Sequence, residues 1–144
     1  MQRKATAVWH GAGKDGTGTI ESQSGALRAH PYSASTRFED EEGRSGTNPE
    51  ELIAAALASC FSMQAAFLLS NAGFPPEELR THADLTLKPV DGKQTIVSIA
   101  LTLEGNVPGV NDADFQRIAN EAKTVCPVSR VLKTDITLSS KLQS

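Results

Sequence analysis

Residues 52–69 carry no charged side chain over eighteen consecutive positions, and this stretch constrains the fold more than any other part of the chain. Its length reaches the threshold for a membrane-spanning helix. Six alanines together with Ser59, Ser62 and Gln64 make it weakly apolar, and the sequence has no second span and no aromatic belt. We therefore predict a helix of a soluble protein, buried on nearly all sides, with small residues that let neighbours approach closely.

Both ends of this helix carry residues that are typical of helix boundaries. Thr47 or Asn48 is suited to cap the start, and the proline and two acids that follow, Glu50 among them, are favourable in a first turn. Gly73 and two later prolines end the helix near Asn71. Glu50 is therefore explained either by its place at the start of the helix or by a role in a functional site, and both interpretations stay open.

Length and charge set the class of protein. A chain of 144 residues is long enough to bury a core, and we expect one domain over residues 1–144. A formal net charge of −3 argues against binding to nucleic acid or to an anionic membrane. The basic start of the chain lacks the apolar core of a secretory signal, so we expect a cytoplasmic protein.

The cysteines and histidines do not form a recognisable metal motif. The sequence has two cysteines, Cys60 and Cys126, which are too few for a disulfide framework. They lie 66 residues apart, which does not match the spacing of a paired-cysteine zinc site. His10, His30 and His82 stand alone. In a reducing cytosol the two cysteines are either inert thiols or a redox pair that opens and closes during function.

The first 40 residues read as β structure, with Arg37 at the end of the last predicted strand. Gly11, Gly13 and Gly16 match a dinucleotide-binding pattern, but a strand-like segment follows them instead of a helix, so we interpret them as a hairpin loop. The acids that follow Arg37 read as a solvated loop. The predicted strands cover residues 5–9, 19–24, 26–30 and 32–38.

The second half of the chain predicts a hairpin, two helices and a last strand. Residues 82–90 and 95–105 alternate as strands around a turn, and Val97, Ile99, Leu101 and Leu103 share one face of the second strand. Asn111 or Asp112 caps a helix whose core positions have helical spacing. Those positions are Phe115, Ile118, Ala119 and Ala122. A short helix over 128–133 and a strand over 135–142 complete a mixed α+β domain.

The two cysteines have different local settings. Cys126 precedes a proline at the start of a short helix, where backbone amides favour a thiolate. Cys60 lies inside a helix, where burial raises a thiol pKa, and a packing role as a small apolar residue is available to it. Judged from local sequence, Cys126 is the more acidic thiol. Cys60 becomes reactive only if a guanidinium reaches it through space, with a glutamate holding that guanidinium by a bidentate pair.

Five segments together resemble the OsmC/Ohr family of thiol peroxidases, and the resemblance is closer to the OsmC branch. They are PYSASTRF, TNPEELIAAALASCFSM, AGF, VPG and CPVSRVLK. The resemblance extends from about residue 5 to residue 142. It implies an α+β fold in which two chains form an intertwined homodimer, with antiparallel sheets wrapped around buried central helices.

The resemblance also implies the chemistry. Cys60 matches the peroxidatic thiol and Cys126 the resolving thiol, while Arg37 and Glu50 match the residues that activate and position the first thiol. The implied substrate is a hydroperoxide and the implied reductant a dithiol, a role that lipoylated proteins serve in relatives. No metal, haem, flavin or nucleotide is required. A helix rises about 1.5 Å per residue, so Glu50 lies about 15 Å from Cys60 of its own chain and is expected to serve the partner's Cys60.

Two other functions stay open at this stage. A carrier of small apolar ligands would leave both thiols inert, and a structural dimer would use the cysteines as a staple in an oxidising compartment. Phe61, Met63 and Phe67 either line an apolar approach that favours organic hydroperoxides or belong to the core.

Overall fold

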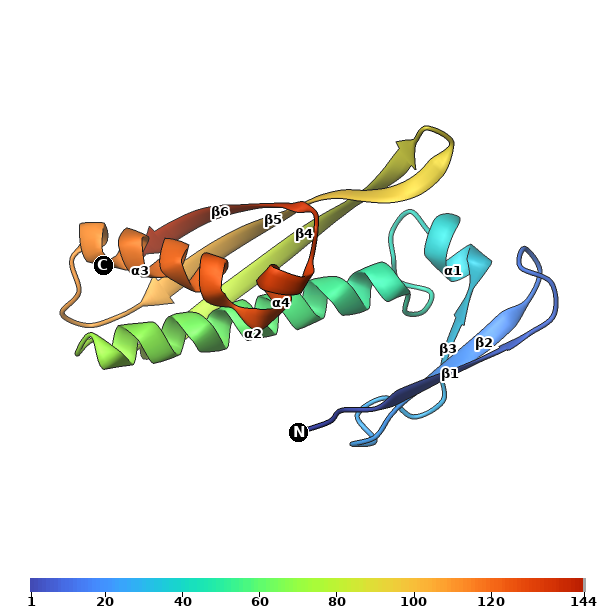
Figure 1. The fold of residues 1–144 in the computed structure, drawn as a ribbon, viewed down its shortest axis with the longest axis horizontal. Helices are drawn as coiled ribbons and strands as arrows, with labels where there is room; N and C mark the ends of the chain where they lie inside the picture. Colours follow the sequence, from blue (N-terminus) through green and yellow to red (C-terminus); the bar gives the residue numbers. More distant parts are fainter. Residues whose placement is uncertain (144) are drawn as a thin grey trace. The chain divides into compact units, whose positions relative to one another are not determined.

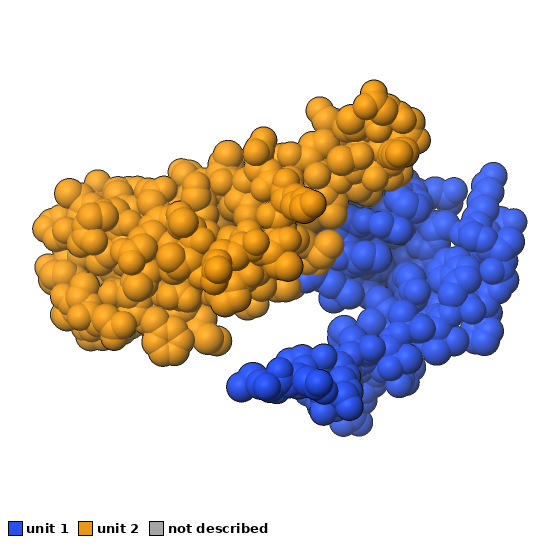
Figure 2. All heavy atoms as spheres, in the orientation of Figure 1, with its two compact units in different colours: residues 1–52 blue, residues 53–144 orange. Residues whose placement is uncertain are grey.

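The computed structural model describes residues 1–143, which form two compact units, Met1–Leu52 and a second unit that begins at Ile53 (Figure 2). The first unit holds a three-stranded antiparallel sheet, a short helix and the start of a long helix. Its elements are β1 (Ala5–His10), β2 (Thr17–Ser22), β3 (His30–Ser33), α1 (Ala34–Phe38) and the first turn of α2 (Pro49–Asn71), as drawn in Figure 1. The sheet has the order β1-β2-β3.

The glycine-rich segment is the loop of the β1–β2 hairpin, as predicted, and no helix follows it. Two glycines beside this loop leave room for aromatic rings. A Cβ at Gly16 would lie 2.7 Å from Trp9 Nε1, and a Cβ at Gly18 would lie 2.6 Å from the ring of Tyr32. Without those side chains, the Trp9 and Tyr32 rings pack with their centroids 5.4 Å apart.

Two of the predicted strands are wrong. Residues 26–29 form bends, and the predicted strand over 32–38 stops at Ser33. Ser33 caps α1, because its Oγ accepts from the Thr36 N–H at 3.1 Å while Thr36 Oγ1 accepts from the Ser33 N–H at 2.9 Å. This reciprocal pair is a capping box, a local signal that the strand interpretation overlooked. Arg37 therefore lies in the last turn of a helix.

Helix α2 begins and ends where predicted. The Asn48 side-chain oxygen accepts from the Glu51 N–H at 2.7 Å, which satisfies one of the free amides of the first turn. At the other end Gly73 has φ 91°, and the Phe74 N–H donates to the Leu69 carbonyl at 2.9 Å. A positive φ after the last turn is the backbone conformation that favours glycine.

The second unit is a three-stranded sheet with helices on one face (Figure 1). Strands β4 and β5 are antiparallel, whereas β6 runs parallel to β5 because the helical crossover between them returns the chain to the end of the sheet where β5 begins. The elements after α2 are β4 (Glu78–Val90), β5 (Lys93–Asn106), α3 (Asp112–Val125), α4 (Pro127–Val131) and β6 (Asp135–Leu142).

A β-bulge in β5 changes which residue faces the core. Thr86 pairs with Ser98 and Leu87 pairs with Ile96, so Val97 has no partner in the ladder. The extra residue rotates the strand, and Ile96 packs against the core in place of the predicted Val97. The prediction for Val97 was therefore wrong, while Ile99, Leu101 and Leu103 are buried as expected.

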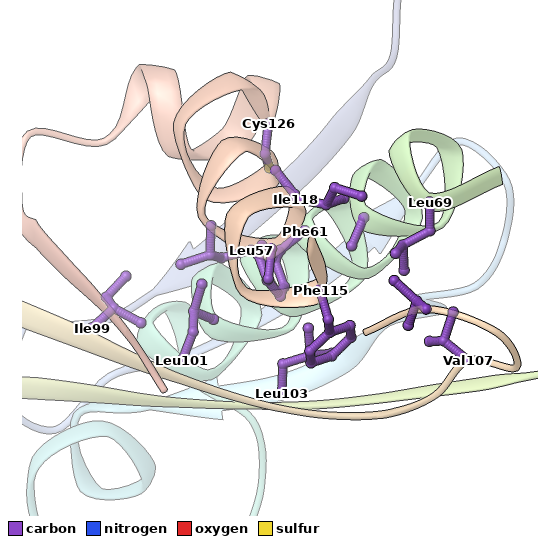
Figure 3. Close-up of a cluster of buried hydrophobic side chains, with 14 residues drawn as sticks. Leu57, Phe61, Leu69, Ile99, Leu101, Leu103, Val107, Phe115, Ile118 and Cys126 are labelled. Atoms are coloured by element: carbon purple, nitrogen blue, oxygen red, sulfur yellow. The ribbon is translucent and has the colours of Figure 1, made fainter. Parts of the chain in front are cut away.

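One apolar core joins α2, α3 and the sheet, and Figure 3 shows its side chains pointing towards one another. The four positions predicted for α3 are all buried. The strand and α3 approach closely at Gly105, where a Cβ would lie 2.7 Å from the Phe115 ring. The buried set is Leu57, Phe61, Ala65, Leu69, Ile99, Leu101, Leu103, Val107, Val110, Phe115, Ile118, Ala119, Ala122 and Cys126.

Helix α2 is less buried than predicted. One face, which includes Leu57 and Phe61, packs against the sheet and α3, but Met63 is 62% exposed and Phe67 60% exposed. A single sheet with one helix beside it covers only one side of α2, so this chain leaves the opposite apolar side open. By length and composition α2 could cross a membrane, but its packed face is that of a core helix.

Candidate active site

The structure brings the two cysteines together. Cys60 lies in the middle of α2, and Cys126 lies between α3 and α4, where it occupies the N-cap position before Pro127. Their sulfur atoms are joined by a hydrogen bond of 2.7 Å, and both thiols are free. Cys126 is completely buried within the core cluster, as Figure 3 shows. Cys60 is half-buried. An incoming reagent therefore has access to Cys60 first.

The environment of each thiol sets its acidity. Burial raises the pKa of Cys60, and its hydrogen bond with Cys126 raises it further, against a smaller opposing effect from the backbone of Val128. Burial also acts to raise the pKa of Cys126, but the Cys60 thiol and the donors of Val128 and Ser129 outweigh it and hold that pKa below its usual value. Within this unit Cys126 is the more acidic thiol, in agreement with the prediction from local sequence.

Arg37 and Glu50 form a second pair, in the first unit. The Arg37 guanidinium donates from Nη2 to Glu50 Oε1 at 2.6 Å, and from Nε to Oε1 and Oε2 at 3.0 and 3.2 Å. The Glu50 side chain is only 11% exposed and that of Arg37 is 38% exposed. Such a forked pair fixes the plane of the guanidinium as well as its position.

The segment between α1 and α2 holds this ion pair in place. Thr36 Oγ1 donates to the Thr47 carbonyl at 3.2 Å and so links the two helix starts. Asp40 closes the acidic loop by accepting from the Ser45 hydroxyl at 2.6 Å and from the Ser45 N–H at 2.7 Å. These hydrogen bonds hold the pKa of Asp40 below its usual value. The predicted solvated loop is thus also a structured turn.

A cavity of about 240 Å³ lies beside Arg37. Its walls include the rings of Trp9, Tyr32 and Phe38, and the Arg37 Cζ lies 4.8 Å from the centroid of the Phe38 ring. The sequence reasoning missed this cavity, although the single tryptophan opposite the small Gly18 in the hairpin was an available signal. The cavity is lined by Trp9, Gly13, Tyr32, Ser33, Ala34, Arg37 and Phe38.

The apolar residues that flank Cys60 in sequence differ in exposure. Phe61 is fully buried in the core, which excludes it from lining an entrance. Met63 and Phe67 are exposed on the open side of α2. Within residues 1–143, no three or more histidine, cysteine, aspartate or glutamate side chains are grouped so that they could hold a metal ion.

Two adjacent free thiols, one accessible and one buried at the start of a helix, define a class of thiol-based redox proteins. Residues 40–141 match the OsmC-like protein family, and this chain belongs to that family. It is 47% identical over 144 residues to peroxiredoxin OsmC of Escherichia coli (strain K12), covering 100% of this chain and 99% of that protein.

More distant proteins agree with this assignment. An organic hydroperoxide resistance protein of Xanthomonas axonopodis pv. citri (strain 306) is 33% identical over 101 residues, covering 67% of this chain and 68% of that protein. An OsmC-like protein of unknown function from Vibrio cholerae superposes with a TM-score of 0.78 at 17% identity, covering 98% of this chain and 99% of the other. That likeness shows the fold, an OsmC-like α+β arrangement.

Proposed function

We propose that this protein is a thiol-dependent peroxidase that reduces organic hydroperoxides, and hydrogen peroxide as well, through Cys60 and Cys126. The observation that carries the proposal is the contact between a half-buried thiol and a buried one, 2.7 Å apart, in a member of the OsmC-like family. A relative that is 47% identical over the whole chain is named a peroxiredoxin, which supports the same activity.

The reaction has two steps at sulfur. The Cys60 thiolate attacks one peroxide oxygen, the O–O bond breaks, and the released alkoxide or hydroxide leaves as an alcohol or water after protonation, while Cys60 becomes a sulfenic acid. Cys126 then attacks the Cys60 sulfur and displaces water to form a disulfide. Because the sulfur atoms already touch, this second step needs little movement and protects Cys60 from further oxidation.

Cys60 needs a cation to act as a nucleophile at neutral pH, because its surroundings in this chain raise its pKa. The proposed cation is Arg37, held by Glu50. Helix α2 is continuous from Pro49 to Asn71, so its rise places Glu50 about 15 Å from Cys60 along the same helix. A glutamate or arginine side chain does not span that length while it keeps the observed ion pair. Arg37 and Glu50 therefore serve Cys60 of a second copy.

The open side of α2 supports this homodimer. Met63 and Phe67 are more than half exposed on a helix that carries no charge from residue 52 to 69. A second copy would cover this apolar side and bring the prediction of a helix buried on nearly all sides into agreement with the structure. Replacing Phe67 with glutamate is expected to convert the dimer to a monomer in light scattering and to abolish turnover.

The aromatic cavity beside Arg37 supports an organic substrate. An alkyl or aryl group in this cavity would place its peroxide oxygens near the guanidinium, which can stabilise the charge that develops on the breaking O–O bond. Hydrogen peroxide lacks a group that fills the cavity, so it gains less from these contacts. The disulfide would be reopened by a dithiol, with a lipoylated protein as the expected form. This cycle would run in the cytoplasm. Residues 1–144 would function as one domain.

The test is peroxide consumption with a dithiol donor by the wild type and by Cys60→Ser and Cys126→Ser variants. Cumene hydroperoxide and hydrogen peroxide are compared, and mass spectrometry follows the cysteines. We expect Cys60→Ser to be inactive, whereas Cys126→Ser completes one turnover and then accumulates over-oxidised Cys60. Normal turnover by Cys60→Ser would refute the proposal and favour a carrier with inert thiols.

A further inference from the structure

The Ser129 side chain has no role in the reaction described so far, and its setting is unusual. Its Oγ is shielded from solvent and has no hydrogen-bond partner among the described residues. Among residues 1–143 it is the one buried side-chain oxygen or nitrogen that lacks a hydrogen-bond partner. A buried hydroxyl without a partner is unfavourable, so such a group calls for a physical reason.

Ser129 stands three residues after Cys126, at the third position of α4. In a capping box the side chain of this third residue reaches back to the N-cap residue. In α4 the N-cap residue is a cysteine and no side-chain cap hydrogen bond forms, so the Ser129 hydroxyl stands beside the Cys126 thiol and acts on its acidity without forming a cap bond. A neutral thiol is a weak acceptor, which explains why the hydroxyl is unsatisfied while Cys126 shares its hydrogen with Cys60.

We propose that Ser129 is a positioning residue whose hydroxyl donates a hydrogen bond to the Cys126 sulfur whenever that sulfur carries negative charge. This inference rests on the proposed peroxidase cycle. Burial has the largest effect on the pKa of Cys126 and raises it, whereas the contact with the Cys60 thiol, and after it the backbone and the hydroxyl of Ser129, lower it. The geometry and the acidity of the thiol thus agree.

The charge on Cys126 matters most when the disulfide is reopened. A thiolate of the external dithiol attacks Cys60 Sγ, a new S–S bond forms there, and the Cys60–Cys126 bond breaks. Its electron pair leaves on Cys126 as a thiolate, which accepts the Ser129 hydrogen bond. The second thiol of the reductant then attacks the reductant's other sulfur, which is bonded to Cys60 in the mixed disulfide. Cys60 leaves as a thiolate, and the reductant becomes a cyclic disulfide.

Ser129 would thereby direct the reductant to one sulfur. Disulfide exchange is faster when the leaving thiol is the more acidic one and when the attacked sulfur is accessible. Cys60 is half-buried and Cys126 is fully buried, so access favours attack at Cys60. Stabilising Cys126 as the leaving thiolate favours the same direction. The mixed disulfide should therefore form on Cys60.

The test compares Ser129→Ala and Ser129→Thr with a Ser140→Ala control, whose hydroxyl donates to Gln116 at 2.6 Å and has no cysteine partner. The preformed disulfide is mixed with a dithiol, and its reduction is followed by stopped flow. We expect Ser129→Ala to slow reduction by about three- to tenfold, because a hydrogen bond to a leaving thiolate is lost. Ser129→Thr should restore the rate, and Ser140→Ala should leave it unchanged.

A second readout separates this role from a structural one. In a Cys60→Ser background, the pH dependence of Cys126 alkylation reports its thiolate directly, and Ser129→Ala should move the profile to higher pH. The same variant should be as stable as the parent or more stable, because it removes an unsatisfied buried hydroxyl. If Ser129→Ala leaves both the alkylation profile and the reduction rate unchanged while peroxide turnover continues, the inference fails and the proposed peroxidase stands. Turnover by Cys60→Ser would instead overturn the peroxidase itself.

Discussion

Replacing Arg37 with methionine removes the only ion-pair partner of Glu50 among residues 1–143 and leaves its carboxylate largely shielded from water. Breaking a fully buried ion pair by removing one partner costs about 3–5 kcal/mol. An exposed pair contributes about 0–1 kcal/mol. The pair lies between these limits, because the Glu50 side chain is 11% exposed and the Arg37 side chain 38% exposed. We therefore expect Arg37→Met to lower the free energy of unfolding by about 1–3 kcal/mol.

A double-mutant cycle isolates the interaction from other losses. Arg37→Met, Glu50→Gln and the double variant are unfolded in urea at one fixed protein concentration, because the stability of the proposed dimer would depend on concentration. If the forked hydrogen bonds act as one unit, the double variant should be less destabilised than the sum of the single variants by about 1–2 kcal/mol. Additivity within about 0.5 kcal/mol would refute the reasoning that the two side chains stabilise each other.

Three further predictions follow from features of the two units. Gly105→Ala places a methyl 2.7 Å from the Phe115 ring, so it should lower the free energy of unfolding by about 1–3 kcal/mol in urea titration. Trp9→Ala removes a wall of the aromatic cavity and should raise KM for cumene hydroperoxide while leaving kcat/KM for hydrogen peroxide nearly unchanged; equal losses for both substrates would contradict the cavity's role. Ser45→Ala should raise the pKa of Asp40 in an NMR titration, since the Ser45 hydrogen bonds lower it. These hydrogen bonds stabilise the folded protein at pH values above the pKa of Asp40 in the unfolded chain. Their stabilising effect is lost as the pH falls through the pKa of Asp40 in the folded protein.

The elements that local chemistry defines could be predicted from the sequence. The ends of α2 depend on Asn48 and Gly73, residues that act within one turn, and both were found at the predicted positions. The α3 core positions follow from helical spacing and are all buried. Helix α1 was missed because its capping box, Ser33 with Thr36, stands at the end of a segment with strand-like composition.

Features that depend on tertiary structure were less accessible. The bulge at Val97 shifts one residue out of the ladder, and alternation alone cannot locate such a shift. The contact between Cys60 and Cys126 joins positions 66 residues apart, so only the family resemblance pointed to it. The acidity of each thiol, by contrast, follows from its place in a helix, and Cys126 at a helix start was the predicted acidic one.

The parallel pairing of β6 with β5 has a consequence for the nascent chain. Cys126 lies on the crossover between these strands, so its thiol is synthesised well after Cys60 has left the ribosome. During that interval Cys60 has no neighbouring sulfur to intercept a sulfenic acid. Under the proposed mechanism an unfinished chain also lacks the guanidinium of a second copy, so its Cys60 should remain a poorly reactive thiol until the crossover docks and the protein assembles. Ribosome-bound chains arrested before residue 126 and exposed to peroxide should keep a reduced Cys60, and released chains should carry the disulfide.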